Sequence, residues 1–276
     1  MSIADKLSAI GRNLTRIFDV GYNKGYGKGH EEGYEEGASE SGYNKGYEDG
    51  YEEGASESGY NKGYEDGKQA EYDAFWDVFQ ENGERNEYTN AFGGSGWTKD
   101  TFKPKYNIVV SNGYMMFRDS KIEGHLGEIL SARGLVLDTS IMYSANYMFS
   151  QCRFTGLPVI NLLGAPSTSN MFGSSSLVTI DKIIVAKKTS FSNDSFSSAS
   201  NLANLTIEGE IGSDINFKWS TKLTRASIES IIGHLSDTAT GKTLTLSKTA
   251  VDTAFPDDWD SYVTANKPGG WTITLV

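Results

Sequence analysis

Short apolar runs recur along the second half of the chain at intervals in the low twenties of residues. The dipeptide Met-Phe occurs at 116–117, 148–149 and 171–172, and Phe196 follows Phe172 by 24 residues. A polar turn and a short apolar run follow each of the later three phenylalanines, and these runs lie at 157–160, 177–180 and 202–207. One repeat of this size cannot bury its own apolar face, so neighbouring repeats have to stack and the ends need caps. The pattern therefore predicts an α/β fold, a solenoid of short parallel strands with helical or irregular returns.

The residues of these repeats resemble a known family. Residues 148–152 read MFSQC and precede LPVI, and residues 171–175 read MFGSS and precede LVTI. These units are similar to BspA-like leucine-rich repeats, whose pattern is MFxxC, a short gap and LxxIP. Cys152 keeps the cysteine position, whereas we expect Ser175 and Ser200 to replace it in the later units. The resemblance covers about residues 107–223 and implies a degenerate leucine-rich-repeat solenoid there.

The segment after the repeats, residues 224–276, is predicted to cap the solenoid. Its apolar spacing predicts a helix over Arg225–Leu235 with Thr224 as the N-cap, because a threonine hydroxyl accepts a hydrogen bond from the first turn of a helix. Ile228, Ile231, Ile232 and Leu235 would form the buried face of that helix. We expect strands at Leu244–Leu246 and Trp271–Val276 to complete the cap.

The segment before the repeats, residues 68–106, is predicted to cap the other end. An amphipathic helix is expected over Lys68–Asn82, with Gly83 placed to end it. Together with Phe92, Trp97 and Phe102, its aromatic face would cover the first repeat. A carbohydrate-binding platform is the alternative interpretation of this aromatic cluster.

Residues 1–20 carry a heptad seam. The seam consists of Ile3, Leu7, Ile10, Leu14 and Ile17, spaced four, three, four and three apart. Such spacing is typical of a coiled coil and predicts oligomerisation through these five residues. A helix this short is only marginally stable by itself in water, so it needs a packing partner. The alternative to a coiled coil is an amphipathic helix that packs on its own chain.

Residues 21–67 form a repeat rich in Gly, Tyr and Glu. The sequence GYNKGYEDGYEEGASES begins at Gly42 and restarts at Gly59, and an earlier copy begins at Gly21. One interpretation is an α-helix that exists only inside an oligomer, because each interior glycine costs about 1 kcal/mol relative to alanine. The other is a flexible acidic tether. On either interpretation the segment is a stalk or spacer.

The distribution of charge also separates the Gly/Tyr repeat from the rest of the chain. The formal net charge is −11, and residues 21–67 carry −8 of it, which leaves −3 for the remainder. Such acidity argues against binding to nucleic acid or to an anionic membrane surface. Residues 1–20 have no apolar run of signal-peptide length, and no window approaches the roughly 18 apolar residues of a spanning helix. We expect a protein made in the cytoplasm, without a signal peptide and without membrane insertion.

No residue pattern predicts catalysis, a cofactor or a metal site. His30, His125 and His234 have no His, Cys or carboxylate at metal-ligand spacing. Gly241-Lys242-Thr243 ends like a phosphate-binding loop, but Ser236 stands where that motif needs glycine. Acidic pairs such as Asp257-Asp258 are expected to be solvated. The single cysteine, Cys152, excludes an intramolecular disulfide, so any bridge would be intermolecular. We therefore expect a protein that is not an enzyme.

The layout as a whole resembles proteins of bacteriophages and prophages of gut Firmicutes. Those combine a short N-terminal heptad, a Gly/Tyr-rich stalk, a segment that here begins AEYDAFWDVF, and a degenerate solenoid. The resemblance implies an adhesion, or receptor-binding, role on the virion surface or tail fibre. The expected fold is then an N-terminal α-helical oligomerisation stalk followed by the solenoid and its C-terminal cap.

The partners follow from this resemblance. We expect a homo-oligomer, with a trimer as first choice, attached to other virion proteins through the N-terminus and binding a host cell-surface protein or glycan. On composition, the candidate ligand-binding residues are Tyr114, Tyr143, Tyr147 and Lys218. The alternative function is that of a bacterial surface or intracellular protein-interaction scaffold of the BspA-like type.

Overall fold

The computed structural model describes Tyr88, residues 90–94 and residues 97–276. The predicted heptad segment at 1–20, the Gly/Tyr repeat at 21–67 and the helix over Lys68–Asn82 lie outside the described residues. The seam residues Ile3, Leu7, Ile10, Leu14 and Ile17 therefore stay predictions.

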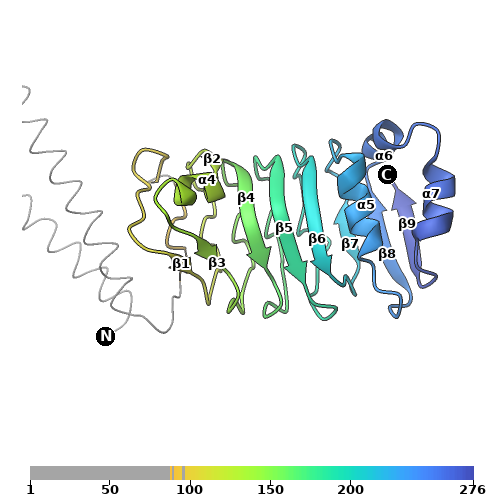
Figure 1. The fold of residues 1–276 in the computed structure, drawn as a ribbon, viewed down its shortest axis with the longest axis horizontal. Helices are drawn as coiled ribbons and strands as arrows, with labels where there is room; N and C mark the ends of the chain where they lie inside the picture. Colours follow the sequence, from red (N-terminus) through yellow and green to blue (C-terminus); the bar gives the residue numbers. More distant parts are fainter. Residues whose placement is uncertain (1–87, 89, 95–96) are drawn as a thin grey trace, which may run out of the picture. The chain divides into compact units, whose positions relative to one another are not determined.

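The described part of the chain is a mixed α/β structure of short parallel strands with few helices (Figure 1). Every pair of neighbouring strands is parallel, in the orders β1-β3, β2-β4-β5-β6 and β7-β8-β9. The elements in chain order are β1 (Ile108–Val109), β2 (Gly124–His125), α4 (Leu126–Ser131), β3 (Leu137–Asp138), β4 (Phe154–Asn161), β5 (Thr179–Val185), β6 (Asn204–Gly209), β7 (Ile215–Phe217), α5 (Arg225–Gly233), β8 (Lys242–Leu246), α6 (Lys248–Ala254), α7 (Trp259–Asn266) and β9 (Trp271–Leu275).

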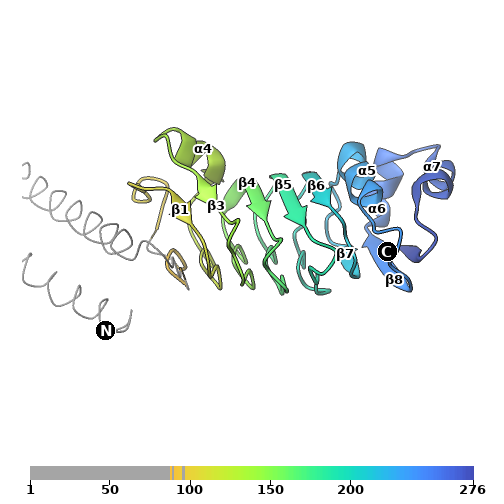
Figure 2. The ribbon, with the colours of Figure 1, turned by 60° about the horizontal axis from the view of Figure 1, so that its bottom comes forward.

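Each strand of the four-stranded sheet pairs with the equivalent segment of the next repeat. Ile180 of β5 lies opposite Leu157 of β4 and Leu205 of β6, which are 23 residues earlier and 25 residues later. The period in the low twenties therefore gives the register of the sheet, and we call each such repeat a layer. Figure 2 shows β4, β5 and β6 side by side, with α4 and α5 at the two ends of the row.

The Met-Phe segments form the opposite side of each layer as consecutive β-turns. In the layer around Phe117, Met116 N–H donates to Gly113 O at 3.0 Å and Arg118 N–H donates to Met115 O at 3.1 Å. Left-handed residues recur four positions apart in three successive layers, at Met115 and Asp119, Tyr147 and Gln151, and Asn170 and Ser174. Since a non-glycine residue in this region costs roughly 1 kcal/mol or more, other interactions must hold these turns.

A second ladder of backbone hydrogen bonds supplies that restraint. Phe117 N–H donates to Met148 O at 2.8 Å, Phe149 N–H donates to Met171 O at 2.8 Å, and Phe172 N–H donates to Ser195 O at 2.9 Å. The turns are thus joined from layer to layer as the strands are on the other side. Each layer is hydrogen-bonded to its neighbour on two sides of the core.

A column of phenylalanine rings runs through the middle of the layers. Its members are Phe92, Phe117, Phe149, Phe172, Phe196 and Phe217, all at most 1% exposed. The centroids of successive rings are 5.1, 5.5, 6.1, 4.9 and 4.3 Å apart. Rings at this spacing gain from stacking in addition to the area that they bury. The column runs through the core of the described structure, which also contains buried aliphatic side chains of the strands such as Leu157 and Ile180.

Phe92 and Phe102, two of the aromatic residues assigned to the predicted N-terminal cap, pack at the first layer. Phe92 packs on Phe117 and meets Phe102 edge-to-face at 5.2 Å. Phe92 is 0% exposed and Phe102 is 1% exposed. Neither ring can offer a face to a sugar, so the carbohydrate-platform alternative is wrong for these two side chains.

Cys152 occupies the position three residues after the phenylalanine of its layer and is buried. Ser175 occupies the same position in the next layer, where its hydroxyl donates to Phe172 O at 2.8 Å. In the layer after that the position belongs to Ala199, which is 1% exposed, and Ser200 is exposed. The prediction that Ser200 replaces the cysteine was therefore wrong by one residue, because the sequence interval does not show which side chain the turn directs inward.

The C-terminal helix begins where the sequence predicted and ends two residues earlier. Thr224 is the N-cap of α5, and its hydroxyl accepts a hydrogen bond from Ser227 N–H at 3.4 Å. The four predicted apolar residues of the helix face are all buried. After α5, β8 pairs in parallel with β7, which precedes the helix, and β9 pairs in parallel with β8, so the stacking of strands continues past residue 223. Within the residues described here, no helix has the length and apolarity needed to cross a membrane.

The phenylalanine column predicts a large loss of stability on truncation. Phe149→Ala should lower the free energy of unfolding by about 3 to 5 kcal/mol, because a fully buried ring is replaced by a cavity. Val136→Ala, at a side chain that is 56% exposed, is the control and should change it by roughly 0.5 kcal/mol or less. Urea unfolding followed by circular dichroism measures both. Equal effects of the two substitutions would contradict a continuous core.

The burial of Cys152 predicts an unreactive thiol. Burial raises the pKa of the Cys152 thiol to about 12, and the thiolate is the reactive form. We expect the folded protein to resist an aromatic disulfide reagent at pH 8 and the urea-unfolded protein to react with one equivalent per chain. Fast reaction of the folded protein would show that Cys152 is accessible, and only then would an intermolecular bridge be feasible without unfolding.

Candidate functional site

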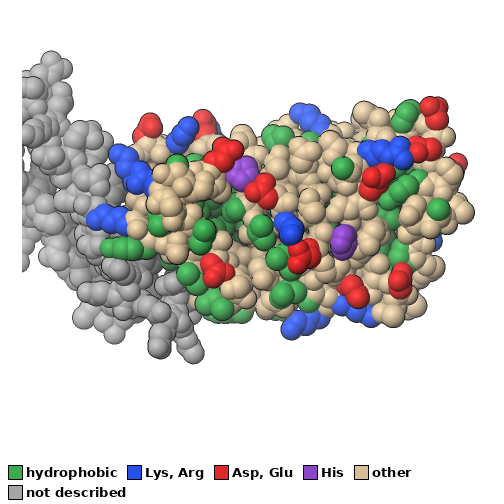
Figure 3. All heavy atoms as spheres, viewed as in Figure 1, with side chains coloured by type: hydrophobic (Ala, Val, Ile, Leu, Met, Phe, Trp, Pro, Cys, Tyr) green, Lys and Arg blue, Asp and Glu red, His purple; other side chains and the backbone are tan. Residues whose placement is uncertain are grey.

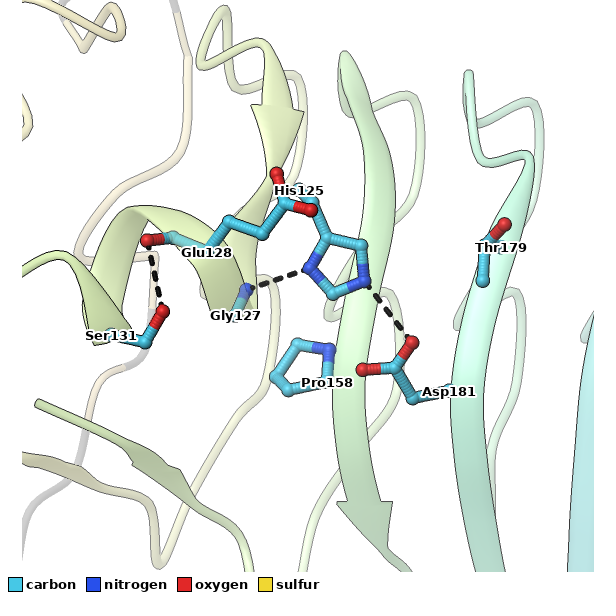
Figure 4. Close-up of a pocket in the computed structure, with 7 residues that line it drawn as sticks. All are labelled: His125, Gly127, Glu128, Ser131, Pro158, Thr179 and Asp181. Carbon is cyan, nitrogen blue, oxygen red and sulfur yellow. Dashed lines mark hydrogen bonds and ion pairs between the residues drawn. The ribbon is translucent and has the colours of Figure 1, made fainter.

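An open depression of about 620 Å³ lies where α4 meets the outer face of β4 and β5 (Figure 4). The end of β2 and residues of α4 from its first turn to Ser131 form one wall, and β4 and β5 form the floor. The lining residues are His125, Gly127, Glu128, Ser131, Pro158, Thr179 and Asp181. His125 and Asp181 point toward one another across it.

The hydrogen bonds of His125 determine its tautomer. Nδ1 accepts from Gly127 N–H at 3.1 Å, so the ring proton lies on Nε2, which donates to Asp181 Oδ1 at 3.2 Å. Both ring nitrogens are therefore engaged, and the lone pair that a general base would need is bound to the helix N-terminus. The geometry makes His125 the N-cap of α4 and a tie to β5.

Glycines on two sides make room for this ring. A Cβ at Gly156 of β4 would lie 1.9 Å from Cδ2 of His125, and a Cβ at Gly127 would lie 3.1 Å from the ring. The first distance is shorter than any van der Waals contact, so only glycine at 156 lets the imidazole lie on the backbone of β4. The depression is thus built around a positioned histidine.

Charged side chains beside the depression pair across strands. Lys182 of β5 and Glu208 of β6 form an ion pair at 2.7 Å on the outer face of the sheet. Acidic and basic side chains are interspersed on the face shown in Figure 3, whereas hydrophobic ones gather below β3 and β4. In the part of the chain that the structure describes, no group of three or more His, Cys, Asp or Glu could hold a metal ion.

Two of the predicted ligand-binding residues meet on the turn side. The rings of Tyr114 and Tyr147 lie edge-to-face with centroids 6.2 Å apart, although 33 positions separate them in the sequence. The guanidinium of Arg118 lies 5.5 Å from the centroid of Tyr147. Both tyrosines are half-buried. Sequence reasoning missed Arg118, although its position directly after Phe117 places it in the same turn as Tyr114.

The other two predicted residues lie elsewhere. Tyr143 is 50% exposed on the segment that follows β3, and its N–H donates to Ser111 O at 2.9 Å. Lys218 lies three layers beyond Tyr147, in the turn after β7. Its ammonium is 5.1 Å from the ring centroid of Trp219, which is 49% exposed. Lys218 therefore belongs to a second, separate cation and aromatic pair.

The phosphate-loop-like triplet, the acidic pair and His234 that the sequence singled out have structural roles. Gly241 has a φ of +63° in the turn that leads into β8, as expected for a strand-entry turn. Asp258, which was expected to be a solvated charge, accepts two hydrogen bonds from Arg225, at 3.1 and 2.7 Å. These bonds lower the pKa of Asp258. His234 follows α5 directly as its C-cap.

Comparisons with protein-family models, with curated proteins and with solved structures find no match. Any functional proposal therefore rests on the sequence pattern of this chain and on the geometry of its residues. They offer two surfaces, the depression around His125 and the turn side around Tyr114 and Tyr147.

A double-mutant cycle tests the role of His125. Gly156→Ala should lower the free energy of unfolding by roughly 1 to 3 kcal/mol, because the new methyl group overlaps the imidazole. In a His125→Ala background the same glycine substitution should cost much less. Thermal unfolding of the four proteins gives the coupling energy. Additive effects would show that Gly156 and His125 do not share a packing constraint.

Proposed function

We propose that this chain is a non-enzymatic adhesion protein of a bacteriophage virion, located on the virion surface or tail. In this proposal residues 1–67 form an oligomeric stalk, and residues 107–223 form a degenerate leucine-rich-repeat solenoid that binds a receptor on the host cell. The resemblance of the layout to phage and prophage proteins motivates the proposal.

One structural observation carries the binding role. Tyr114 and Tyr147 come from successive layers, and their rings meet on the surface while the phenylalanines of the same turns fill the core. Backbone hydrogen bonds from layer to layer hold these turns, so side chains of different layers keep a defined spacing. A rigid scaffold with exposed aromatic and polar groups at a fixed spacing suits recognition, because little conformational entropy is lost on binding.

The stalk would act through valency. Each head that binds brings the other heads of the oligomer close to the same cell surface, so their contacts become intramolecular. Weak affinities of single heads are then multiplied without new contacts. A homotrimer is the simplest arrangement by analogy with viral fibres, and the N-terminus would attach it to other virion proteins.

A BspA-like interaction scaffold of the host bacterium is the second candidate. The observation that favours it is the MFxxC resemblance itself, which spans about residues 107–223 and says nothing of a virion. In that case the same layers would bind a protein partner of the bacterium.

The stalk predicts an oligomer that depends on the seam. The full chain should be an oligomer by light scattering coupled to size-exclusion chromatography, and Leu7→Asp with Ile10→Asp should dissociate it, because charges replace the apolar seam. Ser8→Asp, off the seam, is the matched control and should leave the mass unchanged. A monomeric full-length protein would contradict the stalk.

The virion role predicts that the protein is present in phage particles and that it attaches to host cells. Mass spectrometry of phage particles, purified after induction of the strain that encodes the chain, should detect it. The fluorescently labelled full chain should attach to intact cells of strains that the phage infects and not to resistant strains. Absence from purified particles, together with recovery in the bacterial cell fraction, would favour the scaffold.

A further inference from the structure

A compact group of side chains on the turn side has the chemistry of a saccharide site. Tyr114, Arg118 and Asp119 come from one layer, and Tyr147 and Gln151 come from the next. We call these five residues the Tyr114 patch. We infer that the Tyr114 patch binds a neutral saccharide of a cell-surface glycan, an inference that rests on the proposed adhesion function and gives its ligand class.

The aromatic part of the patch offers a surface for a sugar ring. Tyr114 and Tyr147 meet edge-to-face at 78°, so together they form a corner of two nearly perpendicular rings. The C–H groups on one face of a pyranose carry partial positive charge and pack favourably on the negative face of an aromatic ring. Tyrosine also keeps a hydroxyl at its tip that can donate to or accept from a sugar hydroxyl.

The polar part supplies donors and acceptors of both kinds. Arg118 Nε lies 3.4 Å from Asp119 Oδ2, and its Nη1 donates to the sulfur of Met115 at 3.6 Å, which is a weak acceptor. Among the described residues, the buried Nε has no hydrogen-bond partner. Asp119 accepts, and Gln151, which is exposed, both donates and accepts. The carboxylate of Asp119 and the amide of Gln151 therefore leave hydrogen-bond capacity beside the rings, whereas the buried Nε of Arg118 does not reach the surface.

The charges favour a neutral ligand. Arg118 and Asp119 lie within ion-pair distance, and their side chains are 35% and 44% exposed. Their opposite charges cancel, so the patch has no net charge to attract a carboxylate or a phosphate. A guanidinium with an adjacent carboxylate instead matches vicinal hydroxyl groups, one of which accepts while the other donates.

The backbone beneath the patch is held by the ladder between layers. Asp119 N–H donates to Ser150 O at 3.0 Å, Tyr147 N–H donates to Ser169 O at 2.9 Å, and Gln151 N–H donates to Gly173 O at 2.8 Å. Asp119, Tyr147 and Gln151 all have left-handed φ angles, of 58°, 59° and 58°. The ladder fixes the direction of their side chains before any ligand binds, which reduces the entropic cost of recognition.

Neighbouring layers provide substitutions that keep the backbone. Asn146 stands one layer after Tyr114, and Asn170, with a φ of 48°, stands one layer after Tyr147. Tyr114→Asn and Tyr147→Asn therefore remove a ring and introduce the residue that stands at the equivalent place of the next layer. At Tyr147, whose φ is 59°, asparagine also tolerates the left-handed region. Trp219→Ser is the matched control, because it removes the exposed ring near Lys218 and Ser198 stands one layer earlier.

The experiment is saturation-transfer NMR on the full chain. The probes are glucose, galactose, N-acetylglucosamine and rhamnose as neutral sugars, and glucuronic acid and glycerol 3-phosphate as anionic ones. We expect transfer to the ring protons of at least one neutral sugar and an affinity about tenfold or more weaker in each tyrosine variant, as loss of an aromatic contact implies. Trp219→Ser should bind like the parent, and circular dichroism should show that all variants fold.

Several results would overturn the inference. They are no transfer to any neutral sugar, transfer to the anionic probes alone, transfer that the tyrosine variants leave unchanged, and transfer that Trp219→Ser removes instead. The adhesion assay separates the two proposals. If both tyrosine variants attach to cells as strongly as the parent, the Tyr114 patch is not the receptor site, but the adhesion function stands. If the parent chain binds a sugar but does not attach to cells, the saccharide site stands and the adhesion function is rejected.

Discussion

The structure depends on the burial of one phenylalanine per layer between those of its neighbours. A single layer has two faces and no interior, so its apolar side chains become buried only when another layer covers each face. The rings from Phe92 to Phe217 form one uninterrupted column because four successive layers place a phenylalanine in the same turn, from Phe117 to Phe196, and Phe92 and Phe217 pack on the two ends. Phe102 and Trp97 meet the first ring of the column and cover its end. Stacking is therefore the condition for any layer to be stable.

Two ladders of backbone hydrogen bonds convert that stacking into a defined geometry. The strands β4 to β6 supply one ladder, and the Met-Phe turns supply the other. The second ladder holds residues such as Met115 and Tyr147 at positive φ angles, which residues other than glycine rarely adopt. The same restraint gives side chains of different layers a constant spacing on the surface, and this spacing makes the turn side suitable for recognition. On the strand side, His125 caps a short helix and also ties it to β5 through Asp181.

Several features of the fold could be predicted from particular residues. The interval between Phe149 and Phe172 predicted parallel strands one layer apart, and Thr224 predicted the start of α5, because both depend on local pattern and capping chemistry. Other features could not be read. Ser200 was expected inside and Ala199 is there instead, since the inward direction depends on turn dihedrals that the interval does not encode. Of the candidate site, Tyr114 and Tyr147 were named from composition alone, and Arg118 was missed.

By itself the sequence determined the period, the parallel strands and the residues that cap the C-terminal helix, because these follow from short-range spacing and from the free energy of burying apolar surface. Only the tertiary structure decided which surface residues lie together. Tyr114 and Tyr147 meet although 33 positions separate them, whereas Lys218 lies three layers away beside Trp219. The physical reason is the register between layers, which is set by backbone hydrogen bonds and ring stacking along the whole column and not by any neighbouring pair of residues.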